Sequence, residues 1–358
     1  MSDNARLSFV LSVRQAVRFR AKSIARSAPL GYASAMTADA DSAAQTLFDF
    51  ASMPHWARPR EPVGDATAAA FLSGSALNSL DNLIRSDQPW AGAWRRRLAL
   101  KCAAAAARLA GRPEEEGALR DSFAMTRPGD DAGPGGRILL AWRQLAAPFW
   151  RPLDADALRG VADQLGQPWH DRFGEVAEEQ TATVWSRAAP AAAAATAARV
   201  VAIAPDAEIL AFWLADWTLA KHLRWPAPLP LLIGQVHKPV FRAGGARNRR
   251  IRPGDDPFEA FERAVFLAYA QAAVEAWLLA SRLAGRAARL IAVAPRLRAK
   301  GAADVVQRLL DDESLSASWR GPGGKMSRWA LRRLFERLIE LDAVRELSGR
   351  DTFKIFGL

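Results

Sequence analysis

The chain has 358 residues, enough for two domains or one large domain, and half of them are hydrophobic. Alanine is prominent, β-branched residues are comparatively few, and the single Cys102 excludes an intramolecular disulfide and a cysteine-based zinc site. The net charge of +11 and the pI near 10.6 favour a polyanionic partner, although an arginine-rich composition alone gives the same excess.

This composition predicts a mainly α-helical protein with a multi-helix, bundle-like body. We expect no membrane span, because no apolar run of about 18 residues is free of polar side chains. The most apolar segments contain Asp216 and the pair Gln271 and Glu275, and therefore resemble buried core helices. A single buried cysteine suits a cytoplasmic protein.

Residues 1–55 are predicted to form a basic N-terminal arm that is partly disordered. Arg14, Arg18, Lys22 and Arg26 follow at i+4 spacing and would form one basic stripe on a helix. Such a helix could also lie on a membrane, contact nucleic acid or act as a transit peptide. Charges interrupt its apolar side, so the segment is not a secretory signal.

Helical spacing divides the next part of the chain into two subdomains, 56–150 and 151–297, which we expect to share one core. The first contains predicted helices at 66–86, 90–111, 114–125 and 137–147, with a Gly/Pro loop before the last. The second contains predicted helices at 153–166, 189–205 and 205–225, the last capped by Asp206. A long connection, 226–256, leads to one helix over 257–294, or to two meeting at Gly285.

The pentapeptide Arg-Pro-Gly-Asp-Asp occurs twice, at 127–131 and 252–256. Paired carboxylates could bind a metal or act in acid–base chemistry. Local capping explains them more simply, because Asp256, Pro257 and Glu259 match the N-cap, first and third positions of a helix.

Recognisable catalytic motifs are missing, and we predict a non-enzymatic protein without cofactor, metal site or small-molecule substrate. There is no Walker loop, Rossmann glycine pattern or Gly-x-Ser-x-Gly elbow, and the four histidines lie far apart. The segment from His237 is faintly similar to the Fic-type nucleotidyl transferase signature. Arg242 or Ala243 stands where that signature needs its metal-binding acid, so only a degenerate, inactive relative remains as an alternative.

The pattern changes at Arg298, and residues 298–358 form a predicted C-terminal module. A short amphipathic helix over 301–313 precedes a helix that Ser327 caps. Two strand-prone runs, 343–347 and 352–356, then flank a turn at Gly349. Helix, basic helix and hairpin together resemble a winged helix, although Pro322 and three glycines leave its second helix short or absent.

In a winged helix the basic helix enters the major groove and the hairpin contacts the backbone. The predicted DNA-binding residues are Ser327, Arg328, Arg332, Arg333, Arg337, Arg345, Arg350 and Lys354. Further basic contacts are predicted at Arg14, Arg18, Lys22, Arg26, Arg247, Arg249 and Arg250. Winged helices also dock proteins, and that alternative stays open.

Four segments, 90–121, 127–143, 290–306 and 332–358, together resemble a bacterial family known as domain of unknown function 1403. The resemblance covers about Trp56 to Leu358 and brings no assigned activity. Its closing motif is similar to that of another uncharacterised helical family with a predicted helix-turn-helix. Members of both tend to be plasmid-borne, near genes of the chromosome-segregation type.

We therefore expect a cytoplasmic DNA-binding protein that regulates or maintains plasmid or other mobile DNA. The alternative is an adaptor subunit of a segregation- or defence-type complex, with the wing as its docking site. A protein partner or a homodimer is compatible with either.

Overall fold

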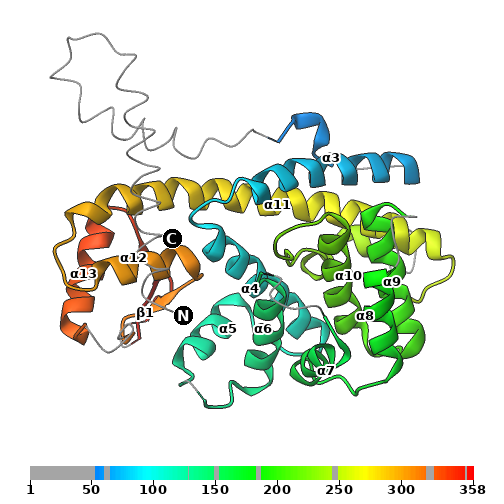
Figure 1. Cartoon of the computed structure of the whole chain (residues 1–358), viewed down its shortest axis with the longest axis horizontal. Helices are drawn as coiled ribbons and strands as arrows, with labels where there is room; N and C mark the ends of the chain where they lie inside the picture. The colour runs from blue at the N-terminus through cyan, green and yellow to red at the C-terminus, as the bar shows by residue number, and fades with distance from the viewer. Residues whose placement is uncertain are drawn as a thin grey trace, which may run out of the picture. The chain divides into compact units, whose positions relative to one another are not determined.

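Helices form nearly all of the regular structure in the computed structural model of the chain (Figure 1). The structure describes residues 53–59, 65–127, 129–148, 153–182, 187–243, 249–319, 326–350 and 353–358, except for the side chains of 179–182. The expectation of a mainly α-helical protein is confirmed. Most of the predicted arm, including the four residues of its basic stripe, lies outside the described residues.

The first helices follow the predicted pattern closely. After η1 (His55–Ala57) come α3 (Ala66–Arg85), α4 (Ala91–Leu109), α5 (Glu116–Met125) and α6 (Gly133–Leu145). Asp65 caps α3, because its Oδ1 accepts a 2.7 Å hydrogen bond from the amide of Ala68.

Helix α6 begins four residues before its predicted start, within the Gly/Pro loop. Pro134 occupies the first turn, where a helix loses no hydrogen bond to proline. The glycines that follow are buried, and a Cβ at Gly135 would lie 2.9 Å from Leu119 Cδ2. Glycine at this position therefore lets α6 approach α5.

The second group comprises α7 (Ala155–Gln164), α8 (Arg172–Ala182), α9 (Ala189–Ile203) and α10 (Glu208–His222). Helix α8 lies in a stretch without clear periodicity and was not predicted. The expected cap at Asp206 is wrong: Ala207 is the N-cap residue, and its amide closes a turn onto Ala204 O at 2.9 Å.

Helix α11 (Phe258–Val293) is a single helix of 36 residues, unbroken at Gly285, and gives way to η4 (Ala294–Arg296) at Pro295. It runs along α3, with α9 near its beginning and α12 near its end (Figure 1). By length and composition alone, 258–296 is the one described helix that could cross a membrane. Here its apolar residues line the core.

The predicted N-cap of α11 is also wrong. Pro257 takes that position, without a side-chain cap, and Asp256 precedes it. The neighbouring Asp255 instead closes the turn before the helix, accepting from the amide of Arg252 at 2.8 Å. In the first copy of the pentapeptide, Asp131 Oδ1 similarly accepts from the amide of Gly133 at 3.0 Å. Both motifs therefore carry local turn contacts.

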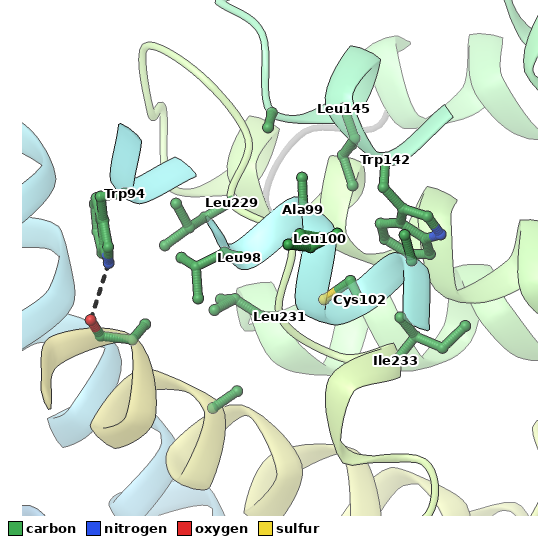
Figure 2. Packing of buried hydrophobic residues seen from close by; sticks show 14 of the residues in the cluster. Trp94, Leu98, Ala99, Leu100, Cys102, Trp142, Leu145, Leu229, Leu231 and Ile233 are labelled. Atoms are coloured by element: carbon green, nitrogen blue, oxygen red, sulfur yellow. Dashed lines mark hydrogen bonds between the residues drawn. The ribbon is translucent and has the colours of Figure 1, made fainter. Parts of the chain in front are cut away.

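Tryptophan side chains join the layers of the core. Trp94 of α4 donates to Ala276 O of α11 at 2.9 Å, and Trp213 of α10 donates to Ala141 O of α6 at 2.9 Å. Figure 2 shows Cys102 on α4 among apolar side chains of α6 and of the 226–256 connection. Burial raises the pKa of this thiol, which agrees with a small core residue.

The 226–256 connection belongs to the core and contains η2 (Ile233–Gln235) and η3 (Pro239–Phe241). Asp216, completely buried on α10, accepts from the amides of Leu231 at 2.8 Å and of Leu232 at 3.1 Å. Main-chain amides therefore satisfy this carboxyl group, and Asp216 fixes the connection against α10.

The C-terminal module contains α12 (Ala302–Asp311), β1 (Leu315–Ser316), α13 (Arg328–Glu340), β2 (Arg345–Glu346) and β3 (Ile355–Gly357). The prediction of a two-stranded hairpin is incomplete, because β1 pairs with β3 and adds a third strand to the sheet. The sheet order is β1-β3-β2, with both pairs antiparallel. Gly349 has a φ of 58°, which supports its predicted place in the turn.

Replacing Asp216 with asparagine should remove a pH dependence of stability. Burial raises the pKa of Asp216 from 3.8 to about 7, so the folded chain retains a proton that the unfolded chain loses. The free energy of unfolding of the wild type should therefore fall by about 3 kcal/mol between pH 4 and 7, relative to D216N. Urea titrations at both pH values measure this difference, and parallel pH profiles would contradict it.

Candidate nucleic-acid interface

Helix α13 is defined by a cap at one end and an apolar face along its length. Ser327 Oγ accepts from the amide of Ala330 at 3.2 Å, which confirms the predicted N-cap. The face toward the module core consists of Leu331, Leu334, Phe335 and Leu338, all buried. Phe335 stacks on Phe356 of β3 with ring centroids 4.1 Å apart. This stack fixes which face of α13 meets solvent.

The predicted arginines of α13 all lie on its exposed side: Arg328, Arg332, Arg333 and Arg337. Arg332 contacts Glu336 at 3.0 Å and Arg337 contacts Glu340 at 2.8 Å. The arginine side chains of these pairs remain 74% and 60% exposed. Such surface pairs contribute at most about 1 kcal/mol, so a phosphate could displace the glutamates readily.

Trp329 is the unexpected residue on this face. It is 68% exposed, whereas Trp90, Trp94, Trp142 and Trp213 are fully buried or nearly so. The guanidinium group of Arg333 lies 4.7 Å from the centroid of its ring. The i, i+4 spacing of these residues on a polar helix face was the signal available in the sequence.

The hairpin residues are less open than α13, because the hairpin docks onto α5. Arg120 Nη2 donates to Leu347 O at 2.8 Å, and Arg350 lies 3.5 Å from Asp121. Lys354 contacts Glu346 at 3.1 Å across the hairpin. Of the three predicted wing cations, Arg350 and Lys354 therefore have acidic partners.

Arg345 is exposed and belongs to a group of cations at the junction of β2 with the body. Partial burial, followed by the charges of Arg286, Arg282 and Arg120, lowers the pKa of Arg345. Arg97 of α4 lies in the same group, and burial lowers its pKa to about 10. A cation group of this kind attracts anions to the junction.

The additional basic residues of the middle of the chain are not part of this interface. Arg250 forms a two-pronged ion pair with Glu208, and Arg249 contacts Asp255 at 2.9 Å. These contacts tie the connection to α10 and to its own turn. Arg247, like Arg14, Arg18, Lys22 and Arg26, lies outside the described residues.

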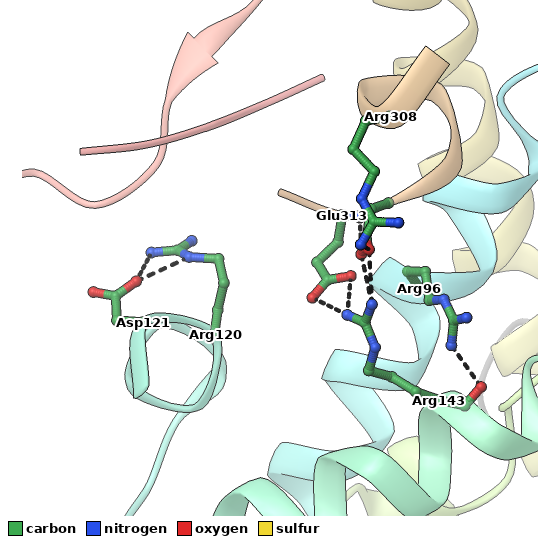
Figure 3. Close-up of polar contacts among 7 residues, drawn as sticks. Arg96, Arg120, Asp121, Arg143, Arg308 and Glu313 are labelled. Carbon is green, nitrogen blue, oxygen red and sulfur yellow. Dashed lines mark hydrogen bonds and ion pairs between the residues drawn. The ribbon is translucent and has the colours of Figure 1, made fainter. Parts of the chain in front are cut away.

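A buried ionic cluster, which the sequence did not predict, attaches the module to the body (Figure 3). Arg143 of α6 donates to both oxygens of Glu313 at 2.6 Å and to those of Asp312 at 2.8 and 2.9 Å. Arg308 also contacts Asp312 at 2.9 Å. Burial and the neighbouring Asp312 raise the pKa of Glu313, so the two carboxyls carry about one charge against Arg143.

Two cavities border α13. One of about 800 Å³ lies between the loop after α5, the β1 region and Arg328. The other, of about 430 Å³, lies between the segment after α11 and the flank of α13 that carries Trp329 and Arg333. The solvent face of α13 thus stands between two hollows.

The transferase-like segment and possible metal-binding groups were the other candidate sites. The Nε2 atom of His237 lies 3.1 Å from Ala105 O, and partial burial lowers the pKa of this imidazole. Among the described residues, no group of three or more His, Cys, Asp or Glu side chains could hold a metal ion.

The profile of the family described as "Protein of unknown function (DUF1403)" matches residues 41–358, and the chain belongs to this family. The match includes every residue that the structure describes. No curated protein and no solved structure matches the chain. The family description states no activity.

Removing Arg143 should weaken the whole molecule, because the buried Asp312 would keep only the half-exposed Arg308 as a cation partner and Glu313 would lose its arginine. We expect R143A to lower the free energy of unfolding by about 3–5 kcal/mol. Glu313 has a raised pKa, so E313Q replaces a protonated acid with a neutral isostere and should cost less than about 1 kcal/mol. Urea denaturation of both variants tests this, and an R143A cost as small as that of E313Q would refute it.

Proposed function

We propose that this member of the family is a non-enzymatic DNA-binding protein that acts through residues 298–358. The observation that carries the proposal is the solvent-exposed arginine face of α13, presented by a small, firmly packed module. Phosphate groups are the partners that such a face suits best, because guanidinium groups bind them in a two-pronged fashion.

The strand order supports a winged-helix type of module. In such folds the strand before the recognition helix pairs with the last strand, which gives the order β1-β3-β2 found here. Helix α13 follows β1, and the β2–β3 hairpin follows α13, as the type requires. The segment where a second helix would stand is only partly described, at 317–319 and 326.

On this proposal, Arg328, Arg332 and Arg333 read the bases or grip the phosphates of the major groove, and Arg345 contacts a phosphate beside it. Arg350 contributes less, since Asp121 partly neutralises it. The role is then regulation or maintenance of plasmid or other mobile DNA, with the helical body as scaffold for a dimer or partner. A cytoplasmic location follows from such a role.

A second candidate function, that of an adaptor, rests on a different surface. Trp56 and Phe71 are both exposed and stack with ring centroids 5.8 Å apart. Exposed aromatic pairs are typical anchors of protein interfaces. An adaptor subunit would use this pair, or the module itself, to hold another protein.

Changing Arg332 and Arg333 to alanine should weaken DNA binding and reduce its salt dependence. Each lost phosphate contact lowers the slope of log K against log salt by about 0.9, so R332A/R333A should lower it by about 2. Fluorescence anisotropy with a labelled duplex over a series of salt concentrations gives both quantities.

The matched control is R159A/R172A, which removes two exposed arginines from α7 and α8. It removes the same charge from a surface outside the module and should leave the slope of log K against log salt nearly unchanged. Equal slopes for the two double variants would argue against α13 as the DNA contact. A wild type that binds no DNA would leave the adaptor as the better proposal.

A further inference from the structure

The smaller cavity beside α13 is a groove whose lining combines arginines with apolar surface. Its volume is about 430 Å³. We call it the basic groove and define it by six of its lining residues: Arg296, Arg298, Trp329, Arg333, Leu334 and Arg337.

The charges of the basic groove favour an anionic ligand. Every ionisable side chain that lines it is an arginine. Arg337 contacts Glu340 at 2.8 Å, but within the described residues no acidic group pairs with Arg296, Arg298 or Arg333. Several uncompensated guanidinium groups around one small hollow attract a polyanion and repel cations.

The apolar part of the groove indicates that its ligand has an apolar surface in addition to a phosphate. Leu334 and the ring of Trp329 line it together with the arginines, and Trp329 is 68% exposed. The guanidinium carbon of Arg333 lies 4.7 Å from the centroid of that ring. This contact orients the indole, and most of the ring stays exposed. An occupant that fits therefore has a negative charge beside a flat apolar face.

We propose that the basic groove binds an unpaired nucleotide, whose base stacks on Trp329 and whose phosphate contacts the groove arginines. This inference rests on the proposed DNA-binding function and names its substrate class: DNA with a single-stranded segment next to a duplex. In a duplex, base faces are covered by their neighbours and cannot reach an indole. An unpaired base exposes that face, and stacking on an aromatic ring tolerates any base.

Position relative to α13 supports the same occupant. Trp329 lines the groove from the helix that carries the proposed duplex contacts Arg328, Arg332 and Arg333, and Arg333 lines the groove as well. A duplex held by α13 would therefore place its end, or an unpaired flanking nucleotide, next to the groove.

The test compares the full chain and its variants on three labelled oligonucleotides of the same sequence: a duplex, that duplex with a single-stranded overhang, and the single strand. For the wild type, the overhang should bind more tightly than the duplex. W329A should weaken overhang and single-strand binding by about 5- to 100-fold and leave duplex binding nearly unchanged. W329F keeps an aromatic face and should retain most of the affinity.

The control is W56A, which removes another exposed tryptophan from a surface that does not line the groove. It should bind all three oligonucleotides like the wild type. Circular dichroism and thermal unfolding should show W329A folded, since an exposed ring contributes little to the core.

The outcomes separate the two proposals. A wild type that binds none of the oligonucleotides refutes DNA binding itself. Tight duplex binding with no overhang preference, or equal losses on all three oligonucleotides for W329A, overturns only the nucleotide site. A peptide rich in aspartate and leucine provides the remaining comparison. If W329A loses that peptide and keeps the overhang, the groove belongs to an acidic protein segment and the inference is wrong.

Discussion

The attachment of the C-terminal module depends on one buried arginine. Arg143 reaches from α6 to the two adjacent carboxyls that follow α12, and it holds them away from water. Close main-chain packing supports the same junction, because a Cβ at Gly92 would lie 2.7 Å from Asp311 Cα. Strong charges buried in a low-dielectric junction tolerate little displacement, so the module and the body form one unit at this point.

This junction determines what the exposed residues can do. With α12 and β1 fixed, the Phe335–Phe356 stack sets the rotation of α13 and turns its arginines outward. The hairpin is held against α5 by Arg120 and cannot swing freely as an extended wing would. The cationic face of α13 is thus an inherent property of the folded unit.

Local signals in the sequence were sufficient for most helices and for the face of α13. Ser327 caps where expected, and Leu331, Leu334, Phe335 and Leu338 follow helical spacing, since both features depend on neighbouring residues alone. The caps at Asp206 and Asp256 were wrong because the N-cap of each helix lies one residue later, at Ala207 and at Pro257. Strand β1 has two residues, too few for a periodic pattern, and its partner lies about 40 residues away.

The remaining features of the candidate site depend on contacts between distant residues. Arg143 and Glu313 are 170 residues apart, and no composition or spacing rule links them. Trp329 was visible as part of a basic helix, but its exposure follows only from the way α13 packs. Asp216 illustrates the same limit, since its amide partners come from a connection without periodicity.

The charge of α13 is distributed unevenly along its axis. Arg328, Arg332 and Arg333 lie in the first two turns, whereas Glu336 and Glu340, with Arg337 between them, lie toward the end, where the helix dipole is also negative. A polyanion would therefore be attracted to the beginning of the helix and repelled from its end. On the proposed function, DNA would therefore contact α13 mainly over its first two turns.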